Sequence, residues 1–343
     1  MAAAALPLLY LIGVRGFNES GQLTNVIAVN ATTGAVRLSP LFVVKSPFAG
    51  CNIAFDPGDA ASKREALFYI PDGSPMEPAP EYAFLSVSTR GEVVRRVKAH
   101  GGTPPGGSWD WPFVSWDAAN QRGLGVGSLR PPPGPEGNTS LVAFDPVTGE
   151  QTVVDGSADL QFVGEEPFCV SGADAQLGAS GSFFFANGII DKQTRQQVVT
   201  VDVASGRVAN AVEVDGALVM SVAGYTGAGA ASVAFVGLEP YTGGPDGAAA
   251  AAAAASTIVR IDPLAKAWKP ETVLTLAAGW SPSQGAMAVA GDTLFVLTQV
   301  DGEGRSQLVV GDLSRDPPAF AAPVDVDLSC CPWGVGALGA TPL

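Results

Sequence analysis

Residues 141–153 read LVAFDPVTGEQTV, and this stretch decides the fold. An alternating apolar run leads into Asp145, a short turn ends at Gly149, and a second apolar-rich run follows. Glycine supplies the positive φ that ends such a turn, and the carboxylate of Asp145 can accept hydrogen bonds from the turn's own amides. The stretch therefore predicts a tight β-hairpin.

Five further stretches repeat this hairpin. They read VIAVNATTG, FLSVSTRGEV, VVTVDVASG, IVRIDPLAK and LVVGDLSRD, and the six turns recur at intervals of about 50 to 60 residues. Each interval is long enough for four strands, and one such sheet is too exposed to be stable alone. The repeat predicts an all-β fold, a single β-propeller of six four-stranded blades, with seven blades as the main alternative. The turns begin at Asn30, Ser88, Asp145, Asp202, Asp262 and Asp312.

The two ends of the chain are expected to share one blade. Residues 8–14, 25–30 and 35–44 supply three strands near the N-terminus, with no innermost strand before them. The run WGVGAL at 333–338 follows the sixth hairpin, and pairing it with residues 8–14 closes the ring and removes the free edges. We therefore interpret 1–343 as one propeller domain. Within it, 239–256 contains eight consecutive Ala and is expected to be a low-complexity loop.

Composition and charge exclude several classes of function. The 42 Gly and 27 Pro suit many short strands joined by turns. The net charge of −14 repels phosphate backbones and anionic lipid, which argues against nucleic-acid binding and membrane insertion. The apolar start has no Lys or Arg before it and is interpreted as a strand rather than a signal peptide. Four irregularly spaced Cys do not form a disulfide framework or a zinc motif. We expect a cytoplasmic or other intracellular protein, with secretion as the alternative.

Aromatic residues gather where the expected innermost strands begin. In several of these places a Pro precedes a Phe or Trp, and the long insertions should emerge on the same face because strands alternate in direction. Such a collar either packs the blades together or forms a platform for a partner. The candidate binding residues are Phe48, Trp109, Trp111, Phe113, Phe168, Trp280 and Trp333.

Polar side chains on this face allow a second interpretation. Asn52, Asp110 and Glu166 offer oxygen ligands that could converge on a divalent cation such as calcium, which would polarise a substrate and activate a bound water. Other chemistries have few candidates, because His100 is the one histidine and no phosphate-binding loop is present. The adjacent Cys330 and Cys331 are either a redox or metal feature or small residues at a crowded centre.

The hairpins VNATTG, FDPVTG and VDVASG resemble those of six-bladed propeller repeat proteins, the group that includes the SMP-30/gluconolactonase-like and NHL-like propellers. The resemblance implies the propeller fold over the whole chain and, for the lactonase-like members, metal-dependent hydrolysis. Those enzymes carry an acidic residue on the first inner strand, whereas the inner strands expected here lack one early in the strand and only Asn52 offers an amide. No catalytic residue is therefore assigned from the resemblance.

Two functions follow from these observations. The first is a non-catalytic scaffold that docks other proteins through its loop-bearing face, within a larger assembly and without a cofactor. The alternative is a calcium-dependent lactonase-like or esterase-like hydrolase that uses Asn52, Asp110 and Glu166. The first is favoured, because the sequence shows few convergent catalytic groups.

Overall fold

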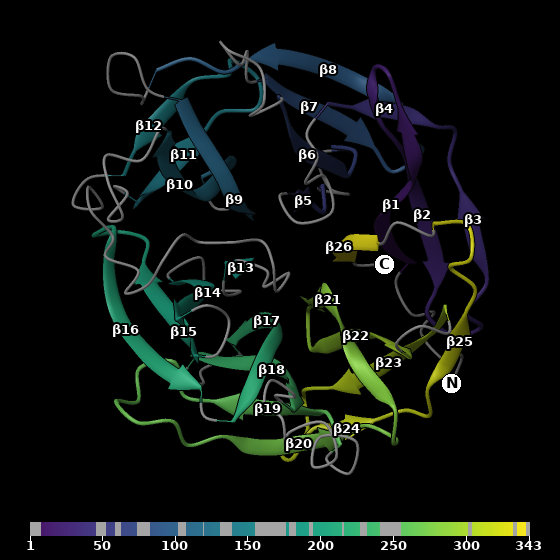
Figure 1. Ribbon diagram of the computed structural model, residues 1–343, viewed down its shortest axis with the longest axis vertical. Coiled ribbons are helices and arrows are strands. Elements are labelled where there is room, and N and C mark those ends of the chain that lie inside the picture. Colours follow the sequence, from purple (N-terminus) through teal and green to yellow (C-terminus); the bar gives the residue numbers. More distant parts are fainter. Residues whose placement is uncertain are drawn as a thin grey trace.

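The computed structural model describes strands and their connections over most of the chain. The described residues are 8–45, 53–58, 63–73, 83–101, 108–118, 120–130, 139–154, 176–177, 183–191, 195–214, 216–226, 232–240, 255–300, 304–331 and 335–340. Every helix or strand assigned in these ranges is a β-strand. Figure 1 shows the strands as antiparallel sheets set around a common centre, which is the arrangement of a β-propeller. The predicted all-β propeller fold is confirmed.

The described strands form six antiparallel sheets, numbered here from the N-terminus and given from the centre outward. Sheet 1 combines both ends of the chain, and sheets 2 and 3 follow in sequence. Sheet 1 contains β26 (Val335–Ala340), β1 (Leu8–Asn18), β2 (Gly21–Asn30) and β3 (Val36–Leu38), with β4 (Phe42–Val44) also paired to β2; sheet 2 contains β5 (Ala54–Asp56), β6 (Leu67–Asp72), β7 (Ala83–Ser88) and β8 (Val93–Lys98); sheet 3 contains β9 (Ser108–Asp117), β10 (Arg122–Arg130), β11 (Thr139–Phe144) and β12 (Gln151–Val153).

Sheets 4 to 6 repeat the same order, and each inner strand leads to the next strand outward. Sheet 4 contains β13 (Gln176–Leu177), β14 (Phe183–Asp191), β15 (Arg195–Asp202) and β16 (Arg207–Val214); sheet 5 contains β17 (Ala217–Thr226), β18 (Ser232–Pro240), β19 (Thr257–Ile261) and β20 (Glu271–Thr275); sheet 6 contains β21 (Trp280–Ala290), β22 (Thr293–Val300), β23 (Arg305–Asp312) and β24 (Ala319–Phe320), with β25 (Val324–Val326) also paired to β23.

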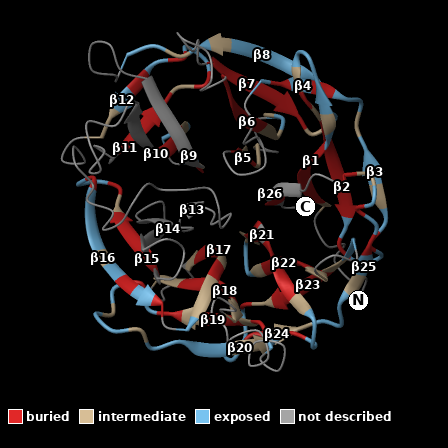
Figure 2. Ribbon diagram, in the orientation of Figure 1, coloured by how far each residue is buried: buried red, intermediate tan, exposed pale blue. Residues whose placement is uncertain are grey.

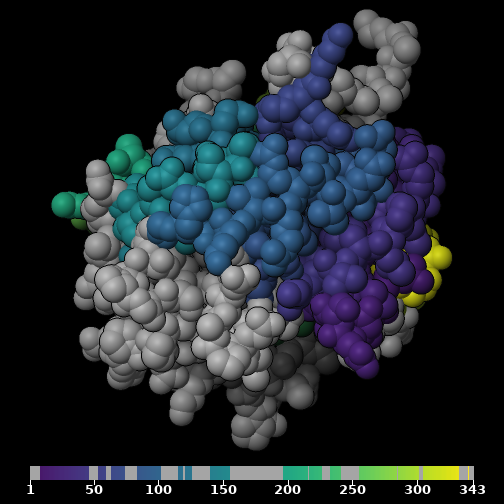
Figure 3. Space-filling view, turned by 90° about the horizontal axis from the view of Figure 1, so that it is seen from above, coloured from purple at the N-terminus to yellow at the C-terminus, as the bar shows by residue number. Residues whose placement is uncertain are grey.

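The predicted pairing of the two chain ends is present. β1 pairs antiparallel with β26, Leu9 facing Ala340 and Gly13 facing Val335. The closing strand lies slightly later than the predicted 333–338, and β1 runs beyond Val14 to Asn18 in a hairpin with β2. On the outside of the molecule, Figure 3 shows yellow residues from the C-terminal part of the chain beside the purple N-terminal part.

Two further predicted boundaries differ from the structure. The outer strand expected over 35–44 is divided into β3 and β4. Between them, the backbone N–H of Ser39 donates to Val26 O, and the Ser39 hydroxyl takes the place of a backbone carbonyl by accepting from Val26 N. Pro40 follows and has no N–H to continue the ladder. The expected loop 239–256 starts too early, since β18 continues to Pro240. Its poly-alanine part lies outside the described residues.

The recurring turns are built as the sequence predicts. Asp145 Oδ1 accepts hydrogen bonds from Val147 N at 2.7 Å and Thr148 N at 3.3 Å, and Gly149 adopts a φ of +82°. The other anchor side chains accept a backbone N–H from their own turns in the same way, which stabilises the reversal of the chain. These are Asn30, Ser88, Asp202, Asp262 and Asp312.

The turns also join neighbouring sheets. At sheet 3, His100 N donates to Gly149 O at 2.9 Å, which ties the end of β8 to the next turn. At sheet 5, Asn210 Nδ2 of β16 donates to the carbonyls of Pro263 and Ala265 at 2.9 and 2.6 Å. At sheet 1, a Cβ on Gly34 would collide with the carbonyl of Asp325, which belongs to β25 of sheet 6. At sheets 1, 3 and 5, the repeated turn therefore packs directly against the preceding sheet.

Apolar side chains fill the spaces between sheets. One cluster between sheets 6 and 1 contains Leu9, Ile27, Phe295 and Leu328, and another between sheets 1 and 2 contains Ile12 and Phe68 with their neighbours. Figure 2 shows buried middle strands and exposed outer strands such as β8 and β16. Burial between sheets is the main source of stability in such a fold.

Candidate functional site

The candidate site is the side of the ring on which the innermost strands begin, called the entry face here. Ser108, Ala217 and Trp280 are the first residues of β9, β17 and β21, and all three strands run away from this face. Because the strands alternate in direction, the connections from second to third strands and from one sheet to the next also leave on the entry face. This is the face on which the sequence predicts a collar.

The structure describes part of the predicted collar. Trp280 is described in full and is half-buried. Four of the predicted residues lie in the first part of β9, at its entry-face end: Trp109, Asp110, Trp111 and Phe113. Their side chains lie outside the described part. The remaining candidates lie outside the described residues: Phe48, Asn52, Glu166, Phe168 and Trp333.

The innermost strands depart from regular pairing near the entry face. In β21, Pro282 faces Thr298 and Met287 faces Val296, so 283–286 oppose a single residue of β22. Pro282 has no N–H to donate, and Gly285 has a φ of +63°, which explains why the chain leaves the ladder here. Bulges of this kind turn side chains away from the regular sheet, and they recur beside functional sites.

Two other inner strands have smaller irregularities at the same end. In β9, residues 111–112, which include Pro112, oppose the single residue between Val126 and Ser128 of β10. In β17, Met220 is the extra residue between Val219 and Ser221. The entry face is therefore lined by inner strands whose regular pairing is interrupted by one or more residues.

Trp280 forms the best-defined contact of the site. The guanidinium carbon of Arg305, at the start of β23, lies 5.5 Å from the centre of the Trp280 ring, a cation–π contact. The backbone places them together, because Trp280 pairs with Val300 and Val300 pairs with Arg305 across three adjacent strands. Side chains of Trp and Arg are common at the energetic centres of protein interfaces.

Hydroxyl and amide groups occur on the neighbouring strands of sheets 5 and 6. Ser283 Oγ donates to Gln299 Oε1 at 3.3 Å, and Thr298 Oγ1 donates to Gln307 O at 3.2 Å. Ser221 Oγ of sheet 5 is buried with no hydrogen-bond partner among the described residues. These groups can hold the inner strands in place, and they do not form a nucleophile and base pair.

Carboxylates with buried side chains are engaged in structural contacts instead. Asp72 accepts from Lys45 N at 2.6 Å and from Arg96 Nε at 3.0 Å, which ties sheet 2 to the end of sheet 1. Asp56 is paired with Arg64, and burial together with this carboxylate raises the pKa of the nearby Tyr69 hydroxyl. Within the described ranges, no three His, Cys, Asp or Glu side chains come close enough to hold a metal ion.

Two features of the site were not predicted. Arg305 was missed because it is distant from Trp280 in the sequence and meets it through the register of sheet 6. The bulge in β21 was also not predicted; the strand starts at Trp280 and has Pro282 as its third residue. A Pro inside an apolar strand was the available signal, since proline is confined to strand edges, starts and bulges.

No protein-family model matches the sequence, and no curated protein matches it. Solved propeller structures do. The chain is similar to a chain from the crystal structure of a nidogen/laminin complex (9% identity, TM-score 0.55, covering 98% of each chain). It is also similar to TolB from Acinetobacter baumannii, with 12% identity and a TM-score of 0.50, covering 99% of this chain and 68% of that one. A mutant apocarotenoid oxygenase from Synechocystis matches with 10% identity and a TM-score of 0.50, covering 96% of this chain and 74% of that one.

These identities are too low to transfer an activity, and the matched structures include both a protein complex and an oxygenase. Within the described part, the structure has no helix that is long and apolar enough to cross a membrane. The comparisons and the structure together identify the chain as a β-propeller.

Proposed function

We propose that this chain is a six-bladed β-propeller scaffold, a single domain over 1–343, that binds other proteins through its entry face. Each of the six sheets is one blade. In this proposal the protein acts without a cofactor, as an intracellular interaction subunit of a larger assembly. The observation that carries the proposal is the half-buried Trp280 with Arg305 stacked on it, at the face where the inner strands bulge.

A rigid frame supports binding at this face. The turns hold neighbouring sheets together through backbone contacts such as His100 N to Gly149 O, so the strands beneath the entry face have little freedom. Fixed side chains lose less conformational entropy when a partner binds. Trp280 and Arg305 offer a flat aromatic surface beside a charge, which suits a peptide segment containing both acidic and apolar side chains.

The test is affinity capture of the full chain, followed by measured binding to each partner recovered. The test variant is Trp280→Ala/Arg305→Ala, extended in a second protein by Trp109→Ala/Trp111→Ala. Truncating interface centres costs about 1.4 kcal/mol or more, so affinity should fall at least about tenfold. Denaturant unfolding of each variant shows whether the propeller itself is intact.

The matched control is Val147→Ala/Leu264→Ala. These residues are exposed apolar side chains in the turns of sheets 3 and 5, on the side opposite the entry face. The control should retain the partners and their affinities. If it loses them while Trp280→Ala/Arg305→Ala retains them, binding occurs at the turns and the proposed face is wrong.

Metal content separates this proposal from the hydrolase alternative. The proposal expects purified protein without stoichiometric divalent cation, and a melting temperature unchanged by calcium or a chelator, because a ligand bound only to the native state would raise it. A stoichiometric metal lost on Asn52→Ala or Glu166→Ala would overturn the cofactor-free scaffold.

A further inference from the structure

Cys330 and Cys331 lie together where the chain turns into the closing strand. Their sulfur atoms are 2.8 Å apart, and both are thiols. A disulfide S–S bond is about 2.05 Å long, so the two atoms would have to approach by less than about 1 Å to form one. Cys330 is half-exposed and Cys331 is buried, so a reagent in solvent reaches Cys330 first.

The surroundings of Cys331 link the pair to ring closure. Its sulfur belongs to the apolar cluster between sheets 6 and 1, and a Cβ on Gly13 of β1 would meet it at 2.5 Å. Cys331 Sγ also donates to Asn25 Oδ1 of β2 at 3.6 Å. Cys331 therefore contacts β1 and β2 directly before the chain enters β26.

Asn25 makes this contact sensitive to the state of the sulfur. Its side chain is fully buried, and its Nδ2 has no partner among the described residues. Among the described residues, Asn25 Oδ1 accepts a hydrogen bond from the thiol of Cys331. Removing the thiol hydrogen would leave a buried amide without this bond, and an unsatisfied buried polar group is costly.

We propose that Cys330 and Cys331 form a reversible oxidation site, closing to a vicinal disulfide with a small-molecule disulfide such as oxidised glutathione as the oxidant. Consecutive Cα atoms are about 3.8 Å apart, below the usual range of disulfide-bonded residues. The bond is therefore strained, and strained, accessible disulfides are the labile and regulatory ones. Oxidation removes the hydrogen bond to Asn25 and loosens the contact between the closing segment and sheet 1.

The reaction proceeds in two balanced steps. The Cys330 thiolate attacks one sulfur of the oxidant, releases one glutathione thiolate and becomes a mixed disulfide. Cys331 then gives up its proton to solvent, attacks the Cys330 sulfur and displaces the second glutathione. Two thiols lose two protons and two electrons, and the oxidant gains them as two thiols.

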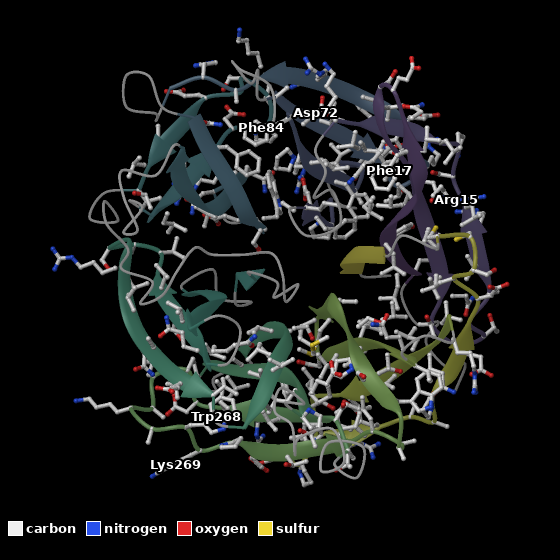
Figure 4. The ribbon with its side chains drawn as sticks, viewed as in Figure 1. Arg15, Phe17, Asp72, Phe84, Trp268 and Lys269 are labelled. Atoms are coloured by element: carbon white, nitrogen blue, oxygen red, sulfur yellow. The ribbon has the colours of Figure 1, made fainter. Side chains whose placement is uncertain are left out.

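The order of attack follows from the two environments. Burial raises the pKa of the Cys331 thiol, Cys330 beside it raises the pKa further, and Arg15 acts in the opposite direction. Arg15 lies on β1 and is labelled in Figure 4. Cys331 is thus a poor nucleophile toward solvent reagents, although it is well placed to resolve a mixed disulfide on its neighbour.

The experiment is intact-mass and peptide analysis of the full chain after equilibration in glutathione redox buffers. A Cys51→Ser/Cys169→Ser background excludes the other two cysteines. This protein should lose two hydrogens and carry no glutathione. Adding Cys331→Ser should stop the reaction at one glutathione on Cys330, and adding Cys330→Ser instead should leave Cys331 unmodified. A stable glutathione adduct without the disulfide, or no reaction under oxidising buffer, would overturn the proposal.

The effect on closure is measured by hydrogen exchange in the same samples. Amides of β1 and β26 should exchange faster after oxidation, and reduction should restore the slow rates. In Asn25→Leu, which has no amide to leave unpaired, oxidation should change these rates less. Equal rates in oxidised and reduced protein would refute the coupling of this site to ring closure.

Discussion

Leu9 of β1 faces Ala340 of β26, so residues near the two ends of the chain are direct neighbours in one sheet. This pairing converts a row of sheets into a ring, and it supplies sheet 1 with the inner strand that the N-terminal segment lacks. With β26 in place, the edge of β1 that faces the centre is paired instead of left free. Stability of the first and sixth sheets should therefore depend on the last strand.

Deleting residues 330–343 should abolish cooperative unfolding. The deletion removes β26 and exposes the cluster between sheets 6 and 1, which includes Leu9, Leu11 and Ala286. Denaturant unfolding followed by fluorescence and circular dichroism measures the result. Deleting 341–343 alone is the control and should unfold like the full chain. A 330–343 deletion that unfolds with the same midpoint and slope would contradict the role of the closing strand.

Gly149→Ala should destabilise the protein more than Gly279→Ala. The two glycines have nearly identical φ values of +82° and +81°, so the backbone cost of an alanine is shared, at about 1 to 2 kcal/mol. Only Gly149 also lies against a neighbouring strand, where its Cβ would strike Lys98 O, while a Cβ on Gly279 meets nothing within 4 Å. Equilibrium unfolding should show an additional loss of about 1 kcal/mol or more for Gly149→Ala. Equal losses would mean that the turn does not fix sheet 3 against sheet 2.

Asp202→Asn should remove part of the loss of stability in acid. Hydrogen bonds from the backbone and hydroxyl of Ser205 lower the pKa of Asp202 below its usual range. A carboxyl whose folded pKa is lowered stabilises the protein above its unfolded pKa of about 3.9, and this contribution is lost as the pH falls through the folded pKa. Urea unfolding from pH 7 to pH 2 should therefore show wild type and Asp202→Asn converging in acid.

The first sheet offers the reciprocal control, because Asn30 fills the same turn position with an amide oxygen that accepts from Thr32 N and Thr33 N. Asn30→Asp should add acid sensitivity of the same sign. A constant difference between wild type and Asp202→Asn at every pH would show that the charge of Asp202 contributes nothing.

Local rules and the repeat made much of the fold predictable. The turn at Asp145 and Gly149 depends on a few adjacent residues, so it could be predicted locally. Because the same turn recurs along the chain, it also predicted the other sheets. The closing strand followed from the missing inner strand of sheet 1, although its bounds shifted because a Gly-rich strand such as VGALGA specifies its register only weakly. The Trp280–Arg305 contact could not be predicted, since it depends on which residues face each other across β22.

Arg122→Met should be strongly destabilising, although it changes only one side chain at the start of β10. Asp117, at the end of β9, has a fully buried side chain, and Arg122 Nε lies 3.0 Å from its Oδ2. Removing the cation leaves the buried carboxylate of Asp117 without its counter-charge. Its Oδ2 then keeps the hydrogen bond from Asn120 Nδ2, at 2.7 Å. Because an uncompensated buried charge is expensive and Arg122 is partly exposed, the expected cost is about 2 to 3 kcal/mol.

A second variant separates the charge from the packing of the arginine. Arg122→Met/Asp117→Asn removes both charges and should recover part of the lost stability. The surface comparison is Arg260→Met, where the exposed partners Glu271 and Asp316 stay hydrated, so the loss should be under about 1 kcal/mol. Urea unfolding at neutral pH measures all three variants. A double variant less stable than Arg122→Met alone would show that the buried carboxylate holds the β9–β10 turn without its cation.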